Sequence, residues 1–126
     1  MSFRSPMGTA RGLGSAKSGF GHWWGQRVSA LALIPLSLWF AGSVLSLSHA
    51  DYSTVVIWMH TPWVAVLLSL FLITLLYHAY LGVQVVIEDY VHTKPLEIAS
   101  LLVIKFACIL LGAAGVFTAL RIAFGA

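Results

Sequence analysis

Charged residues are scarce in this chain of 126 residues: they make up 9% of the sequence, whereas hydrophobic residues make up 60%. Soluble domains carry about a quarter charged residues. So few charges could not cover the surface of a water-soluble core of this size, and the excess hydrophobic surface must face lipid. The scarcity of charge therefore excludes an ordinary soluble domain. The length indicates one domain, residues 1–126.

Cysteine is also scarce. Cys108 is the one cysteine, which excludes an intramolecular disulfide, and its place inside an apolar run is typical of a small buried hydrophobe. The sequence lacks a P-loop, a carboxylate pair and a Cys-x-x-Cys motif, so nothing in it supports a soluble enzyme.

Acidic residues are absent before the first apolar run, where the basic residues gather. These are Arg4, Arg11, Lys17 and Arg27. The segment is too short to present a folded basic face to nucleic acid, and it is typical of the cytoplasmic flank of a membrane helix. Residues 1–21 are rich in Gly and Ser, which predicts an irregular structure there.

Three apolar stretches occupy about residues 28–47, 63–87 and 98–124. Each reaches the roughly 20 residues that cross about 30 Å of hydrocarbon, and backbone groups in lipid must be satisfied within the segment. The first stretch is longer than a signal-peptide core of about 7–15 residues, so we expect it to be retained. Pro35 predicts a modest kink in it. The fold class is therefore an all-α membrane protein with three transmembrane helices.

The distribution of Lys and Arg predicts the orientation. The N-terminal segment, residues 1–27, carries four, the first loop carries none, and the second loop carries Lys94. Positive residues favour the cytoplasmic side, so we expect a cytoplasmic N-terminus and a periplasmic C-terminus. Arg121 opposes this bias, but it is outweighed by the four at the other end.

His78 is the histidine that lies deep in an apolar stretch. It precedes Ile87 by nine residues, which places it roughly 13–14 Å below the cytoplasmic edge, near the bilayer midplane. An ionisable side chain there is a functional-site hypothesis, because its desolvation must be compensated. The alternative is a neutral histidine hydrogen-bonded to a neighbouring helix.

Helical spacing aligns Gly82, Val85 and Asp89 with His78 on one face. A flat macrocycle against a helix needs a ligand followed by a small residue, and Gly82 provides that clearance. Close helix packing is the alternative explanation for Gly82. Heme iron commonly takes axial histidines. The chain has no second histidine at this depth, so a bis-histidine site would need its other ligand from another polypeptide. Lys105 more simply extends toward the membrane surface.

The segment from His78 to Tyr90 reads H-A-Y-L-G-V-Q-V-V-I-E-D-Y. It resembles the H-A-x-x-G-x-x-x-x-x-x-D-Y segment of succinate dehydrogenase hydrophobic membrane anchors, specifically the smaller, D-type subunit. Gly12-Leu13-Gly14, His22 and the run from Gln26 to Ala30 are similar to the N-terminal segment of that family. The longer connection after Tyr90, with His92, departs from its pattern.

The resemblance implies a set of site residues. His78 would be one axial ligand of heme b, bound to its iron, with the other ligand on the larger, C-type anchor. Tyr90 would hydrogen-bond ubiquinone, the substrate, and Asp89 would orient that site or relay protons. Arg27 and His22 would lie near the heme propionates.

The function that the resemblance implies is that of a membrane anchor of succinate:quinone oxidoreductase, respiratory complex II. Such a chain catalyses nothing alone; it tethers the flavoprotein and iron–sulfur subunits to the bilayer beside the C-type cytochrome b subunit. We expect it in the bacterial inner membrane rather than the mitochondrial one. Two alternatives stay open: a fumarate reductase-type anchor, and a structural tether without a redox role.

Overall fold

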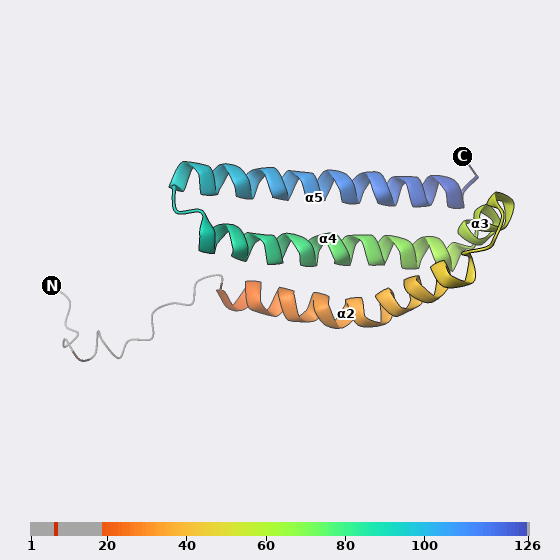
Figure 1. The fold of residues 1–126 in the computed structure, drawn as a ribbon, viewed down its shortest axis with the longest axis horizontal. Coiled ribbons are helices and arrows are strands. Elements are labelled where there is room, and N and C mark those ends of the chain that lie inside the picture. The colour runs from red at the N-terminus through yellow and green to blue at the C-terminus, as the bar shows by residue number, and fades with distance from the viewer. Residues whose placement is uncertain (1–6, 8–18, 126) are drawn as a thin grey trace.

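The computed structural model describes Met7 and residues 19–125. It contains three long helices, α2 (Gly19–Ser46), α4 (Pro62–Tyr90) and α5 (Lys94–Ala123), and one short helix, α3 (Tyr52–Met59). The long helices lie side by side in one layer, with α4 in the middle (Figure 1). Helix α4 packs against both α2 and α5, and α3 packs against the ends of α4 and α5.

The all-helical fold class is confirmed, and the described residues contain no strand. All three long helices are long and apolar enough to cross a membrane. Very few side chains are buried, whereas large apolar side chains are exposed along every long helix. Because lipid is the solvent in which such a surface is stable, the chain is a multi-pass membrane protein.

Helix α2 begins at Gly19, ahead of the predicted start at Val28. Residues 19–21, expected to be irregular, are therefore helical. The aromatic rings of Phe20, Trp23 and Trp24 stack against one another in this first part of the helix, at the three- and four-residue spacings that bring side chains together. The preceding residues, among them Arg4, Arg11, Lys17 and Gly12-Leu13-Gly14, lie outside the described part of the chain. Pro35 lies inside α2, whose second half curves toward α3 (Figure 1).

Helix α3 lies in the first loop, where the sequence predicts only turn-forming residues. Asp51 caps it: its Oδ1 accepts a hydrogen bond from the Thr54 backbone N–H at 3.0 Å, and its Oδ2 accepts one from Ser53 Oγ at 2.7 Å. Such a cap satisfies the free N–H groups of the first turn. The hydrogen bonds from Thr54 and Ser53 lower the pKa of Asp51 from 3.8 to about 2.

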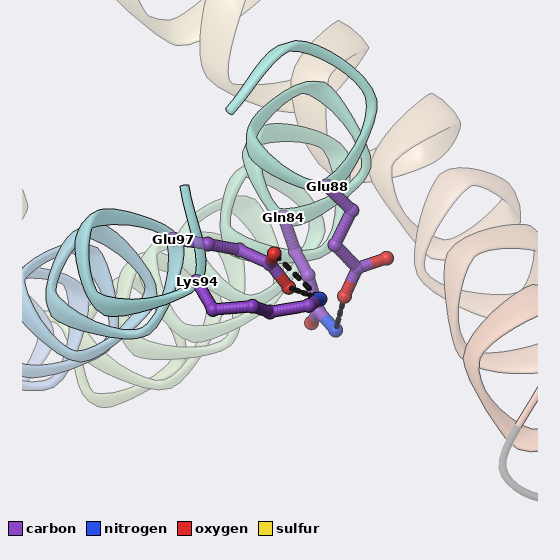
Figure 2. A network of polar contacts seen from close by, with 4 residues as sticks. All are labelled: Gln84, Glu88, Lys94 and Glu97. Atoms are coloured by element: carbon purple, nitrogen blue, oxygen red, sulfur yellow. Dashed lines mark hydrogen bonds and ion pairs between the residues drawn. The ribbon is translucent and has the colours of Figure 1, made fainter. Parts of the chain in front are cut away.

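The second loop is short because both helices it joins have clear ends. Helix α4 ends at Tyr90 and α5 begins at Lys94 with Pro95 in its first turn, where the missing N–H costs nothing. Figure 2 shows the polar contacts near this end: Gln84 donates to Glu88 at 2.8 Å within α4, and Lys94 pairs with Glu97 at 2.7 Å within α5.

Glycines allow the close approach of the long helices. A Cβ at Gly115 of α5 would lie 3.0 Å from Leu72 Cδ1, and one at Gly112 would lie 3.4 Å from Leu76 Cδ1. On the other side of α4, a Cβ at Gly25 of α2 would lie 2.6 Å from Tyr77 Oη. Small residues in membrane helices permit such backbone approach.

Candidate functional site

His78 lies near the middle of α4, about 18 Å along the helix from Tyr90, and is half-buried against α2. Ser29 and Gln26 of α2 contact it, and His22 shares their face of that helix, since the three lie four and three residues apart. The candidate site thus lies where the polar face of α2 packs against the imidazole of His78 on α4.

Ser29 is the one buried polar residue among the described residues. Its Oγ lies 2.9 Å from His78 Nδ1, and it donates to the Gly25 carbonyl at 2.7 Å and the Gln26 carbonyl at 3.1 Å. A hydroxyl has one hydrogen, which these carbonyls share, so Oγ accepts from the imidazole. With Oγ as the acceptor, the imidazole of His78 donates from Nδ1, and in the tautomer with one ring proton the lone pair is on Nε2.

Gln26 lies against that lone pair. Its Nε2 is 3.4 Å from His78 Nε2, beyond the usual 2.7–3.2 Å of a strong hydrogen bond. Its Oε1 is buried and has no hydrogen-bond partner among the described residues. A buried amide oxygen without a partner is costly, so Gln26 is held only weakly in this position.

A groove of about 930 Å³ opens between α2 and α4, at the upper end of the roughly 300–1,000 Å³ typical of ligand sites; Gln26 lines it, whereas His78 and Ser29 do not. His22, Gln26 and Arg27 line it from α2, and Gly82, Val85 and Glu88 from α4. The Nε2 atom of His22 is buried and has no partner among the described residues. Two residues that line the groove, His22 and Gln26, thus each have a buried polar atom without a hydrogen-bond partner among the described residues.

Arg27 is exposed at the side of this groove. Its guanidinium carbon lies 5.8 Å from the centre of the Trp23 ring, within the range of a cation–π interaction. The structure therefore brings Arg27 and His22 to the same groove. This arrangement offers one cation and one imidazole to an anionic group that enters from the start of α2.

Gly82 faces Gln26 across the groove. A Cβ at Gly82 would lie 3.7 Å from Gln26 Nε2, an ordinary van der Waals contact. The packing of α2 on α4 therefore does not require a glycine there, unlike at Gly25. The explanation of Gly82 by close helix packing loses its support within this chain.

Asp89 and Tyr90 lie in the last turn of α4 and are exposed; 81% of Tyr90 is accessible. Neither lines the groove that holds His22 and Arg27. The structure therefore separates the predicted site residues into two groups: His78, His22 and Arg27 at the seam between α2 and α4, and the Asp89–Tyr90 pair at the end of α4.

The described part of the chain contains no group of three or more His, Cys, Asp or Glu side chains able to hold a metal ion. His49, His60 and His92 are exposed. No described histidine besides His78 lies at the middle of a long helix. A six-coordinate iron at His78 would therefore need a ligand from outside the described residues.

Ser29 and Gln26 are the residues whose roles the sequence did not reveal. They belong to the run from Gln26 to Ala30 that resembles the membrane anchors, yet a serine near the start of a membrane helix is unremarkable alone. The available signal was the spacing of His22, Gln26 and Ser29 on one face. What the sequence could not indicate was which face of α2 packs on His78.

Comparison with known proteins gives consistent matches. The family model for the succinate dehydrogenase/fumarate reductase transmembrane subunit matches residues 1–114. The succinate dehydrogenase hydrophobic membrane anchor subunit of Rickettsia bellii is 38% identical over 108 residues, 86% of this chain and 86% of that protein. The subunit of the same name from Paracoccus denitrificans is 29% identical over 126 residues, 100% of this chain and 97% of that protein.

The succinate dehydrogenase membrane anchor subunit of Reclinomonas americana is 31% identical over 96 residues, which cover 74% of this chain and 80% of that protein. No solved structure matches the chain significantly.

Proposed function

This chain belongs to the succinate dehydrogenase/fumarate reductase transmembrane subunit family, as a succinate dehydrogenase membrane anchor, and from this premise we propose that it ligates heme b through His78 and contributes Tyr90 to a ubiquinone site. The observation that carries the proposal is the hydrogen bond between His78 Nδ1 and Ser29 Oγ, 2.9 Å long. It leaves the lone pair on Nε2, the nitrogen that would bind iron, directed into the seam between α2 and α4.

The residues around His78 fit such a group. Nε2 has only the long contact to Gln26, 3.4 Å, and Gln26 and His22 each keep a buried polar atom without a partner in the described chain. Gly82 leaves room for one more methyl group on the groove wall. When bound, heme b would supply one-electron redox chemistry at mid-membrane depth.

His22 and Arg27 would hold the propionates. Both line the groove on the side of the first turns of α2, where the helix leaves the apolar region. A carboxylate there would accept a hydrogen bond from the unpartnered His22 Nε2 if that nitrogen carries the proton, and it would lie beside the Arg27 cation. The residues thus orient the group and neutralise its charge.

The second axial ligand would come from the C-type anchor subunit. A bis-histidine iron needs two imidazoles at one depth, and the described residues supply one. The exposed apolar surfaces of the long helices are available for a second membrane subunit. Half of the site would therefore belong to each anchor.

Tyr90 and Asp89 would act on the quinone. Tyr90 is exposed at the end of α4, and its hydroxyl can donate to a quinone oxygen as negative charge develops there. Asp89 is the adjacent carboxylate and reaches water, so it can pass a proton toward the site. Their exposure in the isolated chain suits a site completed by the iron–sulfur subunit.

Charge and aromatic residues support the proposed orientation. The N-terminal segment carries most of the basic residues, which favours the cytoplasm of a bacterial inner membrane, and puts the C-terminus in the periplasm. Exposed Trp23 and Trp24 near the start of α2, and Trp63 at the start of α4, suit the two opposite interfaces. The second loop, with Tyr90, would then face the flavoprotein and iron–sulfur subunits.

The test uses the assembled complex purified in mild detergent. His78→Leu should abolish the low-spin b-type absorption, whereas His49→Leu, an exposed first-loop control, should retain it. Tyr90→Phe should keep the heme spectrum and lower ubiquinone reduction by on the order of tenfold or more, because one donor to the developing charge is lost. An unchanged heme spectrum in His78→Leu would refute the ligand, and unchanged turnover in Tyr90→Phe would refute the quinone role.

A further inference from the structure

We infer that Ser29 is a positioning residue for the axial ligand: it accepts the Nδ1–H of His78 and thereby holds the imidazole in one tautomer and one ring orientation. The inference rests on the proposed heme ligation and extends it to a residue on a different helix. In this role Ser29 acts through His78, the side chain that it contacts.

The hydroxyl of Ser29 is itself held in place. It is 5% exposed, and its hydrogen is directed to the carbonyls of Gly25 at 2.7 Å and Gln26 at 3.1 Å. Both acceptors belong to the preceding turn of α2, so the direction of the Oγ lone pairs is set by the helix backbone. His78 therefore meets a rigid acceptor, and its ring cannot turn without losing the hydrogen bond.

Gly25 brings that acceptor within reach. A Cβ there would lie 2.6 Å from Tyr77 Oη and 3.3 Å from Leu81 Cδ1, so the glycine permits the close approach of α2 to α4 beside His78. The 2.9 Å bond between Oγ and Nδ1 lies one turn along α2 from this approach. The packing of the seam and the orientation of the imidazole thus depend on adjacent turns of α2.

A hydrogen-bond acceptor at Nδ1 changes the strength with which Nε2 donates electrons to a metal. It increases electron donation from the ring to a bound metal, and ligand partners of this kind typically contribute about 10–100-fold in affinity. Stronger donation favours ferric over ferrous iron, so the Ser29 hydroxyl lowers the midpoint potential. Loss of the hydroxyl should raise the potential and weaken heme retention.

The experiment compares two side chains of the same shape in the purified complex. Ser29→Thr keeps the hydroxyl and its bond to the preceding turn, whereas Ser29→Val replaces the hydroxyl with a methyl group. We expect Ser29→Val to show a more positive midpoint potential in a redox titration, altered g-values of the low-spin ferric heme, and heme dissociation about 10–100-fold faster than in Ser29→Thr.

Ser43→Ala is the matched control. Ser43 lies on the same helix, is half-buried, and donates to the Trp39 carbonyl at 2.8 Å in the same manner, but it contacts no histidine. It should leave the potential and heme retention unchanged. If Ser29→Val and Ser29→Thr have the same potential, g-values and dissociation rate, the inference is wrong. The proposed ligation fails separately, if His78→Leu keeps the heme spectrum.

Discussion

Helix α4 packs against α2 on one side and against α5 on the other, and the two seams are filled differently. Toward α5, leucines lie on glycines: Leu72 on Gly115 and Leu76 on Gly112. Toward α2, the side chain of His78 forms a hydrogen bond with Ser29 and a longer polar contact with Gln26. Grooves lie beside both seams, but the α4–α5 seam packs leucines on glycines, whereas the α2 seam holds polar groups beside its groove.

The difference suggests two roles: the α4–α5 seam holds the helices together, and the α2–α4 seam holds a ligand. Between membrane helices lipid offers no hydrophobic driving force, so tight packing around small residues supplies the association of α4 with α5. The packing of the α2 seam costs more free energy, since residues of this seam bury polar atoms that have no partner in the described chain. Such atoms are tolerated where a ligand or a second chain satisfies them. We therefore expect substitutions at the α4–α5 seam to lower the stability of the complex, and substitutions at the α2–α4 seam to lower its heme content.

The largest effect should come from filling the α4–α5 seam. Gly115→Leu adds a side chain where even a Cβ would lie 3.0 Å from Leu72, so the helices must separate, at about 1–3 kcal/mol. The yield and thermal midpoint of the detergent-purified complex should fall. Gly42→Leu makes the same change on α2, where nothing lies within 4 Å of the added Cβ, and should be tolerated. Equal stability of the two variants would remove the distinction between the seams.

A smaller and more selective effect is expected at the α2–α4 seam. Gly82→Ala places a methyl group 3.7 Å from Gln26 Nε2, which the chain alone accommodates, so the complex should assemble normally. If the groove holds a macrocycle, the methyl group occupies its clearance, and heme content should fall several-fold. Gly112→Ala, with a similar 3.4 Å contact to Leu76, is the control that should retain heme. Heme content per complex, from the pyridine hemochrome absorption, measures the difference.

The fold was largely predictable because its signal is local. The three apolar stretches required three helices, and α4 and α5 extend only a few residues beyond the predicted bounds. The start of α2 at Gly19 was not predictable from hydropathy, because the residues added there are aromatic and polar. Helix α3 was missed because its 8 residues are too few to show a clear helical pattern of apolar residues, although Asp51 is a typical capping residue.

The site was predictable only in part. The depth of His78 follows from counting residues, and its stripe with Gly82 follows from helical geometry. The partner on Nδ1 depends on which face of α2 turns toward α4, and that depends on the approach at Gly25. A long-range contact of this kind leaves no local signature. The Asp89–Tyr90 pair stays a prediction, since its partners would lie on other subunits.

The smallest effect should be found at α3, outside both seams. The folded pKa of Asp51, about 2, is below its ordinary value of 3.8, so its charged form stabilises the cap fully above pH 3.8. This contribution is lost as the pH falls from there toward 2. Asp51→Asn keeps a capping oxygen but does not titrate.

Amide hydrogen exchange of α3 in the intact complex, measured between pH 5 and about 3, should therefore accelerate more in the wild type than in Asp51→Asn once the intrinsic pH dependence is removed. The comparison between these two proteins cancels acid effects on the other subunits. Amides around His78 should respond alike in both, because α3 packs against α4 and α5 and meets α2 through the stacked rings of Trp58 and Trp39, about 15 Å along α2 from Ser29. Acceleration that reaches the α2 seam in the wild type alone would mean that the outer cap and the polar seam are coupled, and that α4 does not separate them.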